Sequence, residues 1–253
     1  MQAAPPPAPS RDLERAASCG EPSYVWRSGQ ERRLTMIRAA LPDLPSARLL
    51  EIGCGVGRYV EKLAALAPFV VGLEYERDRA HQAAARLRPP RLVNGANEAL
   101  PFADGSFDAV LSNEVIEHVA DDALSAREMV RVLRSGGRLV LFCPNRWYPV
   151  EQHGVYWRGA YHFGNVPLVN YLPDRLRDRL APHVRTYTSR RLRGLFAALP
   201  VREVSHHRIF GGYDNVTARL GPPGTLLRDA LHRVEATPLD VVGLSHLLVL
   251  ERL

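Results

Sequence analysis

Cysteine, lysine and long apolar runs are all scarce in this chain of 253 residues. The three cysteines, Cys19, Cys54 and Cys143, are odd in number and lack metal or disulfide spacing, which excludes a disulfide framework and favours a reducing compartment. No apolar run of about 18 residues is present, so we expect no membrane span. Residues 1–10 lack the apolar core of a signal peptide, and we expect residues 1–24 to be a disordered tail of a cytoplasmic protein.

The basic residues are almost all arginine. Lys62 is the sole lysine among 33 basic residues, and the formal net charge is +6. Scattered, solvated arginines are the simplest interpretation, and an anionic partner is the alternative. We find no RNA-binding signature and expect no DNA partner, and the oligomeric state is left open. A hydrophobic content of 46% is normal for a globular domain with a core.

A glycine-rich turn is the strongest motif in the chain. The apolar stretch 49–52 runs into Gly53, Gly55 and Gly57, and residues with helical periodicity follow at once. This order predicts a strand, a tight turn and a helix N-terminus, where backbone can lie directly against a ligand. A dinucleotide turn would need a glycine where Arg58 stands, so the spacing argues against NAD or NADP.

An acidic residue follows at the end of the next apolar strand. Glu74 lies 21 residues after Gly53, where a carboxylate can accept hydrogen bonds from both ribose hydroxyls of a nucleoside. Together with Glu51, the three glycines form the order E-x-G-x-G-x-G. The chain thereby resembles the class I S-adenosylmethionine (SAM) dependent methyltransferases, of the methyltransferase-11 and ubiquinone-biosynthesis methyltransferase kind.

A third segment, 95–108, is similar to the family pattern G-D-A-E-x-L-P-F-x-D-x-S-F-D. The acid that reaches the adenine amino group in the family falls on Ala96, and Asn97 could supply that contact instead. The resemblance implies SAM as the cofactor. It implies a cofactor site made of Glu51, Gly53, Gly55, Gly57, Glu74, Tyr75, Asn97, Glu98 and Asn113.

The alternation of strands and helices predicts an α/β fold. We expect a Rossmann-like, doubly wound, mainly parallel seven-stranded sheet with an antiparallel C-terminal strand pair. Residues 25–253 would form one methyltransferase domain. The expected strands are 47–52, 69–74, 91–94, 107–112, 138–143, 201–210 and 244–252, and the expected helices are 28–41, 57–67, 76–88, 121–133, 189–199 and 222–236.

The segment 112–119 carries the candidate chemistry. On a helix, Glu114, Glu117 and His118 would project from one face and could hold a divalent metal ion. The run resembles metal-binding motifs of ubiquinone-biosynthesis O-methyltransferases and of small-RNA 3′-end methyltransferases, and the latter add a downstream histidine. His153 or His162 could substitute for that histidine. Metal binding, metal-free acid–base catalysis or positioning by Glu117 and His118, and a structural role all remain open.

Residues 146–185 carry seven of the chain's aromatic residues and follow the fifth strand. We interpret this segment as a lid over the methyl acceptor, with an aromatic cap packed for stability as the alternative. Glu151 and His153 at its entrance are further candidates for acceptor contact or general base. The arginines at 175, 177 and 179 suggest a basic amphipathic turn that could rest on an anionic membrane, or simply a solvated helix face.

Together these features predict a SAM-dependent methyltransferase acting on a small or lipid-like acceptor, at oxygen. The alternatives are a catalytically weakened binding protein with the methyltransferase fold, and an RNA-directed methyltransferase.

Overall fold

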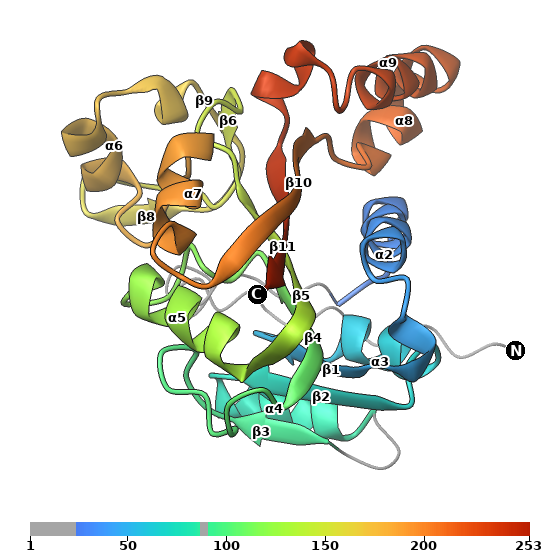
Figure 1. Cartoon of the computed structure of the whole chain (residues 1–253). Helices are drawn as coiled ribbons and strands as arrows, with labels where there is room; N and C mark the ends of the chain where they lie inside the picture. The colour runs from blue at the N-terminus through green and yellow to red at the C-terminus, as the bar shows by residue number, and fades with distance from the viewer. Residues whose placement is uncertain (1–23, 87–90) are drawn as a thin grey trace, which may run out of the picture.

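A seven-stranded sheet forms the centre of the protein in the computed structural model (Figure 1). The structure describes residues 24–86 and 91–253, so the predicted disordered tail lies, except for Tyr24, outside the described residues. The strand order is β10-β11-β5-β4-β1-β2-β3. The strands are β1 (Arg48–Ile52), β2 (Phe69–Glu74), β3 (Leu92–Asn94), β4 (Phe107–Asn113), β5 (Leu133–Pro144), β10 (Val201–Ile209) and β11 (Ser245–Arg252).

The strand directions confirm the predicted fold class. Strand β1 pairs parallel with β2 and β4, and β4 pairs parallel with β5. Strand β11 runs antiparallel to both β5 and β10. Because the parallel strands all end at one edge, the loops after β1, β2 and β4 meet there, as in other doubly wound sheets.

Helices cover both faces of this sheet. On one face, α2 (Ser28–Ala40) and α3 (Arg58–Ala64) pack with Leu34, Ile37, Val60 and Leu63 in the core. On the other face, α5 (Asp122–Val132) and α7 (Ser189–Phe196) bury a second apolar cluster. Helix α4 is Arg77–Ala84, and the short helix η1 is Leu44–Ser46. No helix within the two described ranges combines the length and apolarity needed to cross a bilayer.

The helix expected at residues 114–119 is not formed, which corrects the prediction. Strand β4 ends at Asn113, residues 114–120 form turns, and α5 begins only at Asp122, where the Asp121 side chain caps the Leu124 amide. Glu114 has a φ of 58°, in the left-handed region that side chains other than glycine rarely adopt. The Glu114 carboxylate therefore does not point in the direction that it would take if Glu114 and Glu117 lay on one helix face.

Two small lobes stand above the carboxyl ends of the strands in Figure 1. The insertion, residues 146–185, contains two small sheets, β6 with β9 and β7 with β8. Its elements are β6 (Val150–Glu151), β7 (Val155–Trp157), β8 (Ala160–His162), β9 (Val166–Pro167), η2 (Val169–Tyr171) and α6 (Asp174–Leu180). The other lobe contains α8 (Asp214–Leu220), α9 (Pro222–Arg233) and η3 (Pro238–Val242).

The aromatic residues of the insertion do not form a closed core. Trp147, Trp157 and Tyr171 are 47%, 57% and 44% exposed. Instead, buried side chains of the insertion include an ion pair between Glu151 and Arg177. Arg177 is 2% exposed, so the expected basic face of 175, 177 and 179 is wrong for its central member.

Candidate functional site

One large cavity lies at the carboxyl edge of the sheet, between the glycine turn and the two lobes. Its volume is about 1390 Å³. The glycine turn after β1 and the end of β2 line one part of it, and the loop after β4 and the insertion line another. The residues predicted to contact the cofactor that line it are Glu51, Gly53, Gly55, Glu74, Tyr75, Asn97, Glu98 and Asn113.

The glycine turn adopts the conformation that its sequence predicts. Gly53, Gly55 and Gly57 all have positive φ values, of 64°, 56° and 81°. A Cβ on Gly53 would collide with the side chain of Val115. Gly57 precedes α3, and a Cβ there would lie 2.9 Å from the Cβ of Ala83. Gly57 does not line the cavity, and the close approach of Ala83 leaves no room for a side chain there between α3 and α4.

Two buried carboxylates stand beside this turn. Glu74 Oε2 accepts a hydrogen bond from the Gly55 amide at 2.7 Å, and its Oε1 accepts one from Glu76 at 2.9 Å. Glu51 is 3% exposed, and its Oε2 has no hydrogen-bond partner among the described residues. Burial first, and then the charge of Glu74, raises the pKa of Glu51 well above its usual range. An unpartnered buried carboxylate here fits a cofactor that carries an ammonium and a sulfonium group.

The segment after β3 offers a second polar contact. Asn97 is 6% exposed, and its Nδ2 has no partner among the described residues, which fits the expected contact to an adenine ring. Glu98 also lines the cavity, but its Oε1 accepts hydrogen bonds from the amides of Ala120 and Asp121. Glu98 therefore holds the turn after β4. Tyr75 is 67% exposed at the mouth of the cavity.

An arginine that the sequence did not mark closes the cavity from α2. Arg33 donates to Asn113 Oδ1 at 2.6 Å and to Glu114 Oε1 at 2.7 Å. Glu114 also accepts a hydrogen bond from the Ser245 hydroxyl at 2.6 Å. Burial alone would raise the pKa of Glu114, but the charge of Arg33 and the Ser245 hydrogen bond lower it. Glu114 is thereby engaged with α2 and β11, away from the expected metal set.

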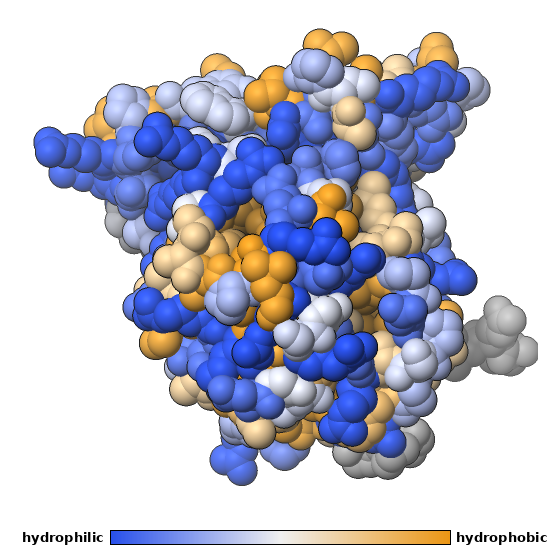
Figure 2. Space-filling view, in the orientation of Figure 1, coloured by the Kyte–Doolittle hydropathy of each residue, from blue (hydrophilic) through white to orange (hydrophobic). Residues whose placement is uncertain are grey.

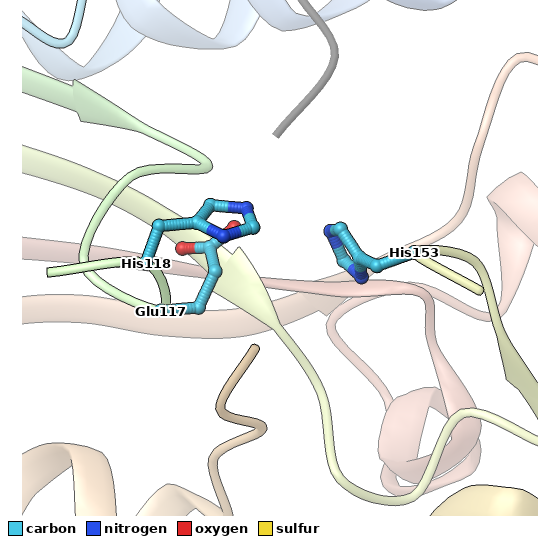
Figure 3. A group of neighbouring side chains, drawn as sticks. All are labelled: Glu117, His118 and His153. Atoms are coloured by element: carbon cyan, nitrogen blue, oxygen red, sulfur yellow. The ribbon is translucent and has the colours of Figure 1, made fainter. Parts of the chain in front are cut away.

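Glu117, His118 and His153 come together at the end of the cavity next to the insertion. Figure 3 shows the Glu117 carboxylate beneath the His118 ring, with His153 facing both. The two imidazole centroids are 5.4 Å apart at 73°. Burial, and then His153, lowers the pKa of His118 to about 3, so this ring is neutral near pH 7. Both histidines line the cavity, whereas Glu117 lies behind them and is 1% exposed.

A buried ion pair between Glu151 and Arg177 holds the His153 side chain in place. Glu151 Oε1 lies 2.9 Å from His153 Nδ1, and Glu151 Oε2 accepts a hydrogen bond from Arg177 at 3.0 Å. Burial would raise the pKa of Glu151, but the His153 hydrogen bond and the charge of Arg177 lower it to about 2. An ionised carboxylate only accepts, so Nδ1 carries the proton, and the neutral ring has its lone pair on Nε2.

Sequence reasoning missed Arg33 and Arg177. Arg33 lies in a helix that the sequence predicts, but nothing in its spacing indicates contact with residues 80 positions later. In the sequence, Arg177 is one of several neighbouring arginines that are expected to lie on the surface. The signal that could have found it is Glu151, since a buried carboxylate in a loop needs a cation or donors.

Comparisons with known proteins agree with the fold and the motifs. Residues 50–141 match the family described as a methyltransferase domain. A probable S-adenosylmethionine-dependent methyltransferase of Mycobacterium tuberculosis is 38% identical over 150 residues, which cover 53% of this chain and 54% of that protein. The chain thus spans about half the length of the curated relatives it matches.

Two solved structures show the same fold at low identity. An S-adenosylmethionine-dependent methyltransferase from Mesorhizobium loti aligns with a TM-score of 0.62 and 19% identity, over 86% of this chain and 96% of that one. The [4+2]-cyclase SpnF aligns with a TM-score of 0.59 and 16% identity, over 95% and 92%. At these identities the likeness concerns the fold alone.

Proposed function

We propose that this chain, whose residues 50–141 match a methyltransferase domain, is a SAM-dependent methyltransferase that transfers a methyl group from SAM to a hydroxyl oxygen of a small or lipid-like acceptor. One observation carries this proposal. A single cavity of about 1390 Å³ joins the glycine turn and Glu74 to His118 and His153. That volume exceeds the roughly 300–1,000 Å³ of a pocket for one small ligand, so it supports cofactor and acceptor side by side.

The residues of the cavity divide into two functions. Glu74 and Asn97 offer acceptors and donors for a nucleoside, and Glu51 offers negative charge for the cationic end of the cofactor. When bound, SAM supplies an activated methyl group. His153 presents Nε2 as a base for the acceptor hydroxyl, because Nδ1 is held by Glu151. As the new O–CH3 bond forms and the S–CH3 bond breaks, the hydroxyl proton passes to Nε2.

Exposed apolar side chains support a lipid-like acceptor. Trp157 and Leu168 of the insertion are 57% and 60% exposed, and Leu239 of η3 is 65% exposed. Figure 2 shows apolar side chains interrupting the hydrophilic surface along the upper edge, where η3 and α9 lie in Figure 1. Apolar groups on both lobes would suit an acceptor with a prenyl or acyl chain, and the insertion would cover that acceptor as a lid.

The proposal is tested by offering labelled SAM with a prenylated phenol, the matching prenylated aniline and a short RNA. We expect S-adenosylhomocysteine and a methyl ether from the phenol, identified by mass spectrometry. His153→Gln should lower kcat about 100-fold or more while SAM affinity stays the same. The matched control is His162→Gln, an exposed histidine in the same insertion, which should behave as wild type.

Three outcomes would contradict the proposal. Methylation of the aniline alone, or of the RNA alone, would show that the acceptor belongs to a class other than the one proposed. SAM binding without any methylated product would favour a binding protein of this fold. Conversion of an acceptor without consumption of SAM would indicate a different reaction on the same fold, which the cyclase SpnF shares.

A further inference from the structure

The lobe that contains α8, α9 and η3 carries a largely apolar surface. We call residues 214–242 the C-terminal lobe. Its large exposed apolar side chains are Leu220, Leu226, Leu227, Leu239, Val241 and Val242. Figure 1 places α9 and η3 at the upper edge of the molecule, and apolar side chains interrupt that edge in Figure 2. A group of exposed aliphatic side chains on one small lobe indicates a surface that contacts another apolar partner.

Helix α9 turns an apolar face to solvent. The residues at i, i+3, i+4 and i+7 of this face are Pro223, Leu226, Leu227 and Ala230, and all four are exposed. Leu226 is 67% and Leu227 is 51% exposed. The buried residue of α9 is Gly224, which packs against α8 on the inner side of the helix. Helix α9 is therefore attached to the lobe through a different side, and its leucines face outward.

The exposed charges of the C-terminal lobe have one sign. Arg219 and Arg233 are exposed, whereas none of the aspartates and glutamates of residues 214–242, all of which the structure describes, is exposed. Each acid of the lobe has a partner: Asp214 with Ser28, Asp229 with Arg228, Glu235 with Arg32, and Asp240 with Arg208. The outer surface of the lobe is therefore apolar and cationic.

A second copy of this chain fits this surface poorly. In a two-fold dimer the patch meets itself, so Arg219 and Arg233 of both copies would enter an interface without an exposed carboxylate to receive them. Residues 214–242 also contain no Phe, Tyr or Trp, the residues enriched in the cores of protein interfaces. An anionic bilayer supplies both an apolar phase for the leucines and negative charge for the arginines.

We propose that the C-terminal lobe docks on an anionic lipid bilayer, with the apolar face of α9 among the headgroups and Arg219 and Arg233 against lipid phosphates. This surface is distinct from the arginine run at 175–179, whose central member is buried. What the bilayer supplies rests on the proposed function, while docking itself does not. Asp214, Asn215 and Val216 at the start of α8 line the large cavity, so docking would bring a lipid-like acceptor next to the cavity wall.

Docking is tested on the full chain by sedimentation with vesicles, without SAM or acceptor. We expect binding to vesicles of equal parts phosphatidylcholine and phosphatidylglycerol, and at least about tenfold weaker binding to phosphatidylcholine alone. The double variant Leu226→Ser with Leu227→Ser should bind the anionic vesicles about 30-fold or more weakly, because two apolar side chains no longer leave water. The matched control is Leu168→Ser with Leu176→Ser, two exposed leucines of the insertion, which should bind as wild type.

The arginines are tested in the same assay. Each arginine near an anionic surface contributes about fivefold in affinity, so Arg219→Gln with Arg233→Gln should weaken binding about 10- to 30-fold. Added salt should weaken the wild type more than this variant, because it screens the removed charges. The control is Arg38→Gln with Arg127→Gln, exposed arginines of α2 and α5, which should bind as wild type.

The outcomes separate this inference from the proposed function. Circular dichroism verifies that each variant is folded, and analytical ultracentrifugation measures its oligomeric state. Absence of vesicle binding, or equal binding by wild type and the α9 leucine variant, would overturn docking and leave methyl transfer standing. Loss of binding in the insertion control alone would place the membrane contact on the insertion and overturn the proposal.

Two further outcomes are decisive. A dimer that dissociates in the α9 leucine variant, without vesicle binding by the wild type, would assign this face to a second copy of the chain. Vesicle binding without methyl transfer to any acceptor would support docking and remove the proposed function. If both hold, the leucine variant should methylate a prenylated phenol in vesicles more slowly than wild type, and the same phenol in detergent at an equal rate.

Discussion

The Glu151 carboxylate bridges Arg177 and His153, with its two oxygens 3.0 Å from the guanidinium and 2.9 Å from the imidazole. Arg177 also donates to the carbonyl of Val184 at 2.7 Å. This chain of contacts runs from α6 through β6 to the cavity wall. The orientation of His153 thus depends on an ion pair buried inside the insertion.

Breaking this ion pair should destabilise the protein. Arg177→Met leaves the Glu151 charge buried without its cation, so we expect a loss of about 3–5 kcal/mol in the free energy of unfolding. The double variant Arg177→Met with Glu151→Gln should be less destabilised than the single variant, because the uncompensated charge is gone. Urea denaturation followed by circular dichroism measures both values.

The control for this pair is Arg179→Met on the same helix. Arg179 is exposed, and its substitution should change stability by no more than about 0.5 kcal/mol. The single variant Glu151→Gln is measured as well. If the loss of stability in the double variant equalled the sum of the losses in Arg177→Met and in Glu151→Gln, the two side chains would be energetically independent.

Removal of the Glu74 carboxylate should weaken cofactor binding. Glu74→Ala removes the acceptor of the Gly55 amide as well as the expected ribose contacts. Each charge-assisted hydrogen bond contributes about 1.5–3 kcal/mol, so the affinity for SAM should fall at least about tenfold. Calorimetry with SAM and S-adenosylhomocysteine measures this change, with the exposed Asp43→Ala as control. Equal affinity in Glu74→Ala would exclude Glu74 from the cofactor site.

Acid should destabilise the fold through His246. His246 belongs to β11, which lies between β5 and β10, and its side chain is fully buried, with Nε2 2.8 Å from the Tyr187 carbonyl oxygen and Nδ1 3.0 Å from His206 Nε2. Burial is the first cause that lowers the pKa of His246, to about 4, against about 6.5 in an unfolded chain. Between these values the unfolded state binds a proton that the folded state does not. The contribution of neutral His246 to stability is therefore fully present above about pH 6.5, and it is lost as the pH drops toward 4.

The magnitude of this effect is set by one proton. The free energy of unfolding should fall by up to about 1.4 kcal/mol per pH unit from this histidine, and His206 acts in the same direction. His246→Gln retains a donor and an acceptor without titrating, so its stability should depend less steeply on pH by about one proton. Urea denaturation at several pH values between about 4.5 and 7 measures the two slopes, and identical slopes would contradict the role of His246.

The sheet and the cofactor half of the cavity follow from local sequence. Strands such as 69–74 are short apolar runs bounded by turn residues, and the three glycines adopt the positive φ values that their spacing predicts. Since parallel strands place the loops that follow them at one edge, Glu74 and the glycine turn could be brought together without knowledge of side-chain contacts.

The acceptor half depended on contacts between distant segments. The prediction that Glu114, Glu117 and His118 project from one helix face was wrong, because Arg33 on α2 binds Glu114 and the backbone at Glu114 is left-handed. His153 joins His118 because the insertion folds back over the sheet.

The sequence by itself determined where the central strands lie along the chain, the glycine turn and the carboxylates at its edge, because these depend on periodicity and backbone conformation within a few residues. Only the tertiary structure decided which charged side chains are buried and paired. Arg177 looks like any surface arginine in the sequence, yet it is buried against Glu151 and sets the position of His153. Burial of a charge is a property of the whole packed chain, since its cost is met only by partners that folding brings from elsewhere.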